Sequence, residues 1–139
     1  MPRLLAVVGA VTPPGRLDAA VRFAADCAGA LPDVSATVLS LGAHRISFAD
    51  GRPLEGYADD TARIVGAVAA ADAVLLASPV YRASFTGALK NLLDLTPLTA
   101  LRAKPVGIVA MGANKRPGWR SGKSTGGCTV AHSMGSPWR

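Results

Sequence analysis

Leu76-Ala77-Ser78-Pro79-Val80-Tyr81-Arg82-Ala83-Ser84-Phe85-Thr86-Gly87-Ala88-Leu89-Lys90-Asn91-Leu92-Leu93-Asp94 is the stretch that decides the fold. It predicts a buried strand, a short loop that carries an aromatic residue, and then an amphipathic helix. In a parallel α/β sheet, ligands bind at the loops that leave the carboxyl ends of the strands. The ring faces of Tyr81 and Phe85, together with the hydroxyl groups of this loop, suit a flat ligand with polar edges.

Strands and helices alternate along the chain as far as Gly112. This alternation indicates a parallel sheet with right-handed crossovers and helices on both faces. Short apolar runs predict strands at 3–8, 34–41, 73–77 and 105–111, with the second at a sheet edge. Helices are expected from Asp18 to about Ala28, from Asp59-Asp60-Thr61 onward, and from near Thr86 to Thr96-Pro97.

Each expected helix has an apolar face that should contact the sheet. Asp18 is the expected cap of the first helix. The buried positions are expected to be Val21, Ala24, Ala25 and Ala28 in the first helix, Ile64, Val65 and Val68 in the second, and Leu89, Leu92 and Leu93 in the third.

The 139 residues, half of them apolar, fit one domain with a hydrophobic core. No apolar run is long enough to span a bilayer. The start, Met1 to Val11, resembles a weak signal peptide, but we interpret it as the first buried strand. Cys27 and Cys128 form neither a disulfide framework nor a metal-ligand spacing, which fits a reducing cytoplasm.

Residues Ser78 to Asp94 resemble a run of the NADPH-dependent FMN reductase family almost position by position. That run reads Ser/Thr-Pro-Val-Tyr-Lys/Arg-x-Ser/Ala-Phe/Tyr-x-Gly-x-Leu-Lys and is followed by a Leu-Asp pair. The resemblance is strongest to the branch that supplies reduced flavin to two-component sulfonate monooxygenases. It implies a flavodoxin-like sheet with strand order 2-1-3-4 over about Arg3 to Gly112. The competing interpretation is a strand-turn-helix unit that only packs.

The resemblance also implies one flavin site built from three loops. The first would hold the FMN phosphate, although Ala10 stands where the family has a serine, and a plain Pro-Gly turn is the alternative. The second would hold the isoalloxazine edge and the ribityl chain, and the third would lie near the ring. The expected cofactor-binding residues are Thr12, Gly15, Arg16, Ser78, Pro79, Val80, Tyr81, Arg82, Ala83, Ser84 and Gly112.

The activity implied by the resemblance is hydride transfer from NADPH or NADH to FMN, and the sequence does not distinguish the two nicotinamides. Such chemistry belongs to the cofactor, so no catalytic acid–base pair and no metal are expected. The family further implies a monooxygenase that receives the reduced flavin, and a homo-oligomer. A flavin-dependent quinone or azo reductase and an inactive remnant are the alternatives.

The character of the chain changes after Gly112. Residues 113–139 contain five basic residues and no acid, whereas residues 1–112 hold ten basic and nine acidic ones. A nucleic-acid partner would therefore depend on the tail alone, and neither nucleic acid nor membrane is expected. Val130 is the tail's one branched aliphatic residue. We expect an incomplete flavin-binding domain at 1–112 and a basic, disordered tail at 113–139 that leaves the fourth strand unpaired. The tail is then either a product of truncation or frameshift, or a natural basic extension.

Overall fold

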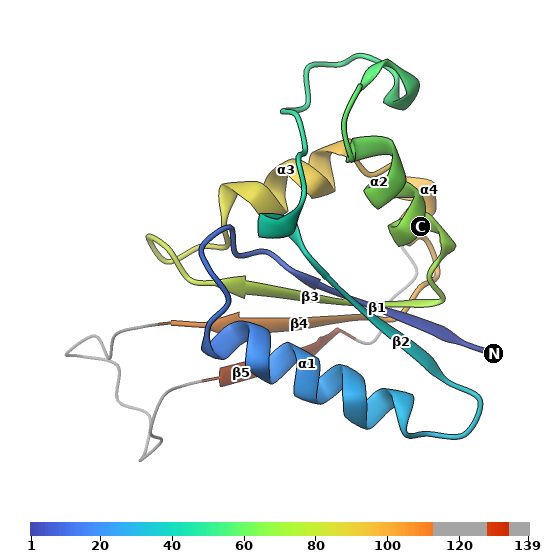
Figure 1. The fold of residues 1–139 in the computed structure, drawn as a ribbon, viewed down its shortest axis with the longest axis vertical. Coiled ribbons are helices and arrows are strands. Elements are labelled where there is room, and N and C mark those ends of the chain that lie inside the picture. Colours follow the sequence, from blue (N-terminus) through green and yellow to red (C-terminus); the bar gives the residue numbers. More distant parts are fainter. Residues whose placement is uncertain (113–127, 134–139) are drawn as a thin grey trace.

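The computed structural model describes residues 1–112 and 128–133 of the chain. Its sheet has the strand order β2-β1-β3-β4-β5, in which the first four strands are parallel and β5 is antiparallel to β4. Figure 1 shows α1 on one face of this sheet and α2, α3 and α4 on the other. The flavodoxin-like order 2-1-3-4 expected from the sequence is confirmed.

The elements follow the alternation of apolar runs in the sequence, and the expected strands are confirmed to within two residues at each end. Three short helices add to the expected set: α4, and the 3₁₀ helices η1 and η2 in the long β2–α2 connection. The elements are β1 (Arg3–Val8), α1 (Arg16–Gly29), β2 (Ser35–Ser40), η1 (Leu41–Ala43), η2 (Leu54–Gly56), α2 (Thr61–Ala70), β3 (Ala73–Pro79), α3 (Gly87–Leu95), α4 (Leu98–Leu101), β4 (Val106–Met111) and β5 (Cys128–Ser133).

The hydrophobic core consists of two clusters, one on each face of the sheet, because helices cover both faces. β1 lies between β2 and β3 and contributes side chains to both clusters. Leu5 and Val7 belong to the apolar cluster under α2 and α3, whereas Ala6 and Val8 belong to the cluster under α1. Successive side chains of a strand point to opposite faces, so a continuous apolar run is what a doubly covered strand requires. None of the described helices is long and apolar enough to cross a membrane.

Three expectations about helices need correction. Gly15 is the N-cap of α1, and Asp18 lies three residues further on, in the first turn. Ala24 is exposed, because it lies outside the narrow stripe of α1 that Val21 and Ala25 bury against the sheet. Leu93 is only partly buried, since Leu89, Leu92 and Leu95 occupy the core-facing side of α3.

The expectation that the fourth strand stays unpaired is wrong. β5 pairs with β4 in an antiparallel register that places Val130 opposite Val109 and Cys128 opposite Met111. An open strand edge offers backbone donors and acceptors, so a short segment with β-branched Thr129 and Val130 can pair without a long apolar run. The other tail residues, 113–127 and 134–139, lie outside the described part of the chain.

The sheet register brings the carboxyl ends of three strands together. Val8 of β1 is paired with Ala77 of β3, and Pro79 of β3 is paired with Met111 of β4. The loop before α1, the loop before α3 and the residues after β4 therefore leave the same edge of the sheet. This edge is where a parallel α/β sheet binds its ligands.

Candidate functional site

A cavity of about 810 Å³ lies at this edge, where the loops after β1, β3 and β4 meet. Its volume is within the range of small-molecule and cofactor sites. The lining combines backbone of tight turns with few charged side chains. The lining residues are Ala10, Thr12, Pro13, Gly15, Arg16, Leu17, Asp18, Pro79, Val80, Tyr81, Arg82, Ala83, Met111 and Gly112.

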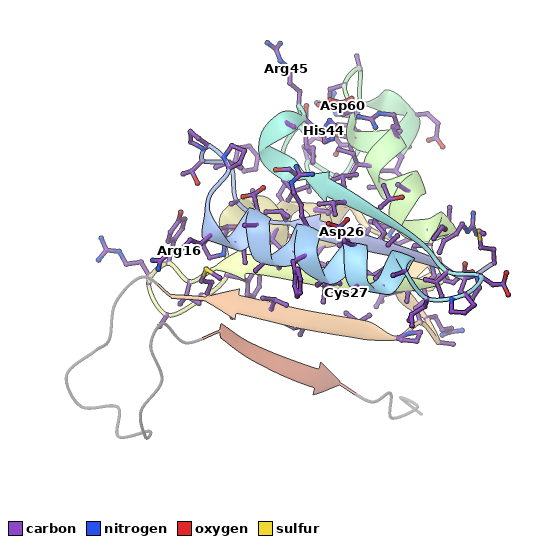
Figure 2. All side chains as sticks on the ribbon, turned by 60° about the horizontal axis from the view of Figure 1, so that its bottom comes forward. Arg16, Asp26, Cys27, His44, Arg45 and Asp60 are labelled. Atoms are coloured by element: carbon purple, nitrogen blue, oxygen red, sulfur yellow. The ribbon has the colours of Figure 1, made fainter. Side chains whose placement is uncertain are left out.

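The amino-terminal end of α1 forms one end of the cavity. The first backbone N–H groups of a helix have no partner inside the helix and are oriented toward a bound anion. Gly15, the N-cap, is in an extended conformation, and its N–H donates to Oδ2 of Asp18 at 3.3 Å. Arg16 follows at the first helical position, and Figure 2 shows it at the beginning of α1.

The loop after β3 is a tight hairpin turn. The N–H of Tyr81 donates to the carbonyl of Ser84 at 2.9 Å, and the N–H of Ser84 donates to the carbonyl of Tyr81 at 3.0 Å. Between them, Arg82 and Ala83 both have positive φ angles, 53° and 63°. Two successive left-handed residues are typical of a type I′ turn, which glycine and asparagine adopt more readily than arginine and alanine. The turn leaves the Tyr81 side chain 52% exposed beside the cavity.

Buried hydroxyl groups fasten this turn to the loop after β1. Thr86, the N-cap of α3, donates its hydroxyl to the carbonyl of Gly9 at 2.6 Å and accepts from the N–H of Leu89 at 3.2 Å. The hydroxyl of Ser78 accepts from the N–H of Thr86 at 3.0 Å. A Cβ on Gly9 would lie 3.0 Å from the carbonyl oxygen of Ala77, so this close approach requires glycine.

A backbone hydrogen bond joins the residues after β4 to the loop after β3. The N–H of Val80 donates to the carbonyl of Met111 at 2.9 Å, just beyond the last pair of the β3–β4 ladder. This bond places Gly112 beside Pro79 and Val80 at the cavity. The three loops are therefore cross-linked by hydrogen bonds that do not depend on a ligand.

Most of the cofactor-binding residues expected from the sequence line the cavity. Of those residues, Ser78 and Ser84 do not line it. Ser78 is buried beneath the loop, where its hydroxyl holds Thr86, and Ser84 closes the hairpin through its backbone. The lining residues Thr12, Gly15, Arg16, Pro79, Val80, Tyr81, Arg82, Ala83 and Gly112 were all expected from the sequence.

Sequence reasoning missed five lining residues, Ala10, Pro13, Leu17, Asp18 and Met111. Asp18 is the informative omission, because its side chain is charged and only 4% exposed. Its position three residues after Gly15 was a usable signal, since the first turn of a helix after a sheet strand borders the ligand edge. From the sequence alone, Asp18 is expected only as a helix cap.

Other carboxylates form hydrogen bonds in the β2–α2 connection. Asp59 accepts from the hydroxyl of Ser47 at 2.6 Å and from the N–H of Thr61 at 2.9 Å, and these bonds lower its pKa. The guanidinium of Arg63, 2.8 Å away, lowers the pKa of Asp60. Figure 2 shows Asp60 next to His44, and the pair is 3.7 Å apart. Neither carboxylate lines the cavity, so these bonds fasten the connection and leave the site to its three loops.

Comparison with known proteins agrees with this geometry. The family model of NADPH-dependent FMN reductases matches residues 2–125, which extends past Gly112 into the tail. The NAD(P)H-dependent FAD/FMN reductase of Geobacillus thermodenitrificans is 41% identical over 81 residues, 58% of this chain. The NADH-dependent FMN reductase SfnF of Pseudomonas putida is 48% identical over 50 residues, 36% of this chain.

Among solved structures, an apo NADH:FMN oxidoreductase has a TM-score of 0.68 and 25% identity, covering 82% of this chain and 60% of its own. The chain spans only part of the curated relatives, 44% of the Geobacillus protein and 27% of the Pseudomonas protein. The family match nevertheless covers most of the sequence, and the solved structure is similar in fold over 82% of this chain. The chain belongs to the NADPH-dependent FMN reductase family.

Proposed function

We propose that this chain binds FMN in the cavity between the three loops and reduces it with NADPH or NADH. The observation that carries the proposal is that Pro79 to Ala83, the centre of the Ser-Pro-Val-Tyr-Arg-Ala-Ser run, line a cavity of about 810 Å³ at the carboxyl edge of the sheet. A ligand of flavin size fits that volume, and the lining offers flat apolar surface with a few polar groups.

The donor set of the cavity fits the parts of FMN. Thr12, Gly15 and Arg16, at the amino-terminal end of α1, would hold the phosphate with a hydroxyl, backbone N–H groups and a cation. The turn from Pro79 to Ser84, together with Gly112, would hold the ring and the ribityl chain. Ser78 and Ser84 would act through the shape of that turn, because neither lines the cavity.

Bound flavin would supply the redox chemistry, accepting a hydride from the nicotinamide at its N5 atom. The protein's residues then have to bind, orient and shield it. The exposed ring of Tyr81 at the cavity margin would cover one side of a flat ligand, and the hydrogen bonds between the loops would keep the binding geometry fixed before the ligand binds.

We further propose that reduced FMN leaves to serve a flavin-dependent monooxygenase, and that the protein works in the cytoplasm as a homo-oligomer. The resemblance of Ser78–Asp94 to the sulfonate-monooxygenase branch supports the acceptor. A flavin-dependent quinone or azo reductase would keep its flavin and pass electrons to an added quinone. Steady-state assays with free FMN against quinones separate the two.

The proposed binding is tested by titrating the purified chain into FMN and following flavin fluorescence. Saturable quenching, and NADPH oxidation at 340 nm that depends on added FMN, are the expected results. Lumazine, a pteridine that lacks the benzenoid ring and the ribityl phosphate of FMN, is a suitable control ligand. Absence of any saturable signal with FMN at millimolar protein would overturn the proposal.

A further inference from the structure

We infer that Asp18 offsets the attraction of the helix end for the flavin phosphate, so that the site binds riboflavin about as well as FMN. This inference rests on the proposed function and extends its substrate class to riboflavin, whose ribityl chain ends in an uncharged hydroxyl group. Asp18 would then be a specificity-determining residue of this chain.

The placement of Asp18 is the first step of the argument. It lies in the first turn of α1 and lines the cavity beside Gly15 and Arg16, where the flavin phosphate would be held. Its side chain is 4% exposed, so its position is fixed by packing. A carboxylate held there is close to any anion that approaches the helix end.

The hydrogen bond of Asp18 is the second step. Its Oδ2 accepts from the N–H of Gly15 at 3.3 Å, one of the helix-end donors that would otherwise be available to a phosphate. A carboxylate in the first turn also interacts favourably with the helix dipole. The helix end therefore already contains its own anion, and a phosphate would have to share the N–H of Gly15 and approach a like charge.

Charge balance within the cavity is the third step. The described lining contains two cations, Arg16 and Arg82, and one anion, Asp18. Within the described part of the chain, neither arginine forms an ion pair with Asp18. Both arginines are exposed to solvent, which screens their charge, whereas the buried carboxylate is screened less. At the helix end, the carboxylate of Asp18 therefore offsets the attraction of these cations for a phosphate.

The test compares FMN with riboflavin, which differ only in the phosphate. Both flavins are titrated by fluorescence against the wild type and Asp18→Asn at the same pH and ionic strength. Asn keeps the shape and an acceptor oxygen for the Gly15 N–H but removes the charge. We expect wild-type dissociation constants within about tenfold of each other. In Asp18→Asn the FMN constant should fall at least tenfold, while the riboflavin constant changes less than twofold.

Asp26→Asn is the matched control, because it makes the same charge change on the same helix. Asp26 is exposed and lies eight residues further along α1, about 12 Å by helix rise. Figure 2 labels Arg16 at the beginning of this helix and Asp26 further along it. The Asp26→Asn substitution should change neither the FMN nor the riboflavin dissociation constant. Asp18→Ser, which also retains a hydrogen-bond acceptor, replaces Asp18→Asn if that variant has lost its thermal transition.

The outcomes separate the inference from the proposed function. A wild type that binds FMN more than about tenfold tighter than riboflavin overturns the inference, as does an equal change for both flavins in Asp18→Asn. Either result would leave flavin binding itself intact. Failure of both flavins to bind any of these proteins overturns the proposed function and the inference with it.

Discussion

The hydroxyl of Thr86 donates to the carbonyl oxygen of Gly9 at 2.6 Å, across 77 residues of sequence. The hydroxyl oxygen of Thr86 also accepts from the N–H of Leu89, so one side chain caps α3 and fixes the loop after β1. Both contacts are buried. A single threonine therefore connects two of the three loops that form the cavity.

Thr86→Val should destabilise the chain, because it keeps the volume of the side chain and removes both hydrogen bonds. Loss of an N-cap costs about 0.5–2 kcal/mol, and a buried carbonyl left without its partner adds about 1–3 kcal/mol. Urea unfolding followed by circular dichroism measures the sum. Thr86→Ser should recover most of the loss, and Thr99→Val, at an exposed position of α4, should change stability by less than about 0.5 kcal/mol.

Tyr81→Asp should weaken FMN binding at least tenfold, which corresponds to about 1.4 kcal/mol. The change removes the ring beside the cavity and introduces a charge of the same sign as the phosphate. Tyr81→Phe, which retains the ring, should bind within about threefold of the wild type. Phe23→Asp is the control for a general effect, because Phe23 is 71% exposed on α1 and does not line the cavity. Equal affinity of Tyr81→Asp and wild type in a fluorescence titration would remove this loop from the site.

Adjacent leucines of α3 offer a matched pair for the core. Leu92 is 1% exposed and packs in the cluster under α2 and α3, so Leu92→Ala should cost about 2–5 kcal/mol. Leu93 is only partly buried, and Leu93→Ala should cost clearly less. Chemical denaturation of the two variants compares them directly. Equal losses would mean that α3 is rotated relative to its position here.

Much of the parallel sheet could be predicted from the sequence because its strands are short, apolar and separated by helices with one apolar face. The apolar run of β1 and the spacing of the apolar residues in α2 were enough to predict that strand and the buried residues of that helix. The candidate site followed from the same logic, since the loops at the carboxyl edge contain its residues. The Ser78–Asp94 run then narrowed its ligand class by resemblance.

What the sequence could not predict depends on contacts distant along the chain. β5 pairs because the edge of β4 is open, and a segment with one branched aliphatic residue contains no local signal for this. The role of Ser78 as a support beneath the loop depends on Thr86, which is brought to it by the turn. Asp18 looks like an ordinary helix cap until the cavity beside it is known.

The left-handed turn after β3 should be relaxed by glycine. Ala83 has φ of 63°, a conformation that costs an alanine roughly 1 kcal/mol and glycine almost nothing. Ala83→Gly should therefore raise the free energy of unfolding, or leave it unchanged where the greater freedom of the unfolded chain offsets the gain. Ala88→Gly, the same change inside α3, should lower it by about 1 kcal/mol. A loss at Ala83 as large as that at Ala88 in urea denaturation would contradict the strain.

Asp59 should make the stability of the chain depend on pH in the acid range. Its hydrogen bonds with Ser47 and Thr61 favour the ionised form and hold its pKa below the usual range in the folded state. A group whose pKa is lowered by folding contributes stability above its unfolded pKa, about 3.9, and loses that contribution as the pH falls through the folded value.

The test is the difference in stability between the wild type and Asp59→Asn, measured by thermal melting from pH 3 to pH 7. The wild type should be more stable by a constant amount above about pH 5, and the difference should shrink as the pH drops below about 4. Asp26→Asn, at an exposed site on α1, should instead give melting curves that stay close to wild type across the range. A gap for Asp59→Asn that is the same at pH 3 and pH 7 would show that Asp59 acts through packing or neutral hydrogen bonds, and that its charge has no part in holding the β2–α2 connection.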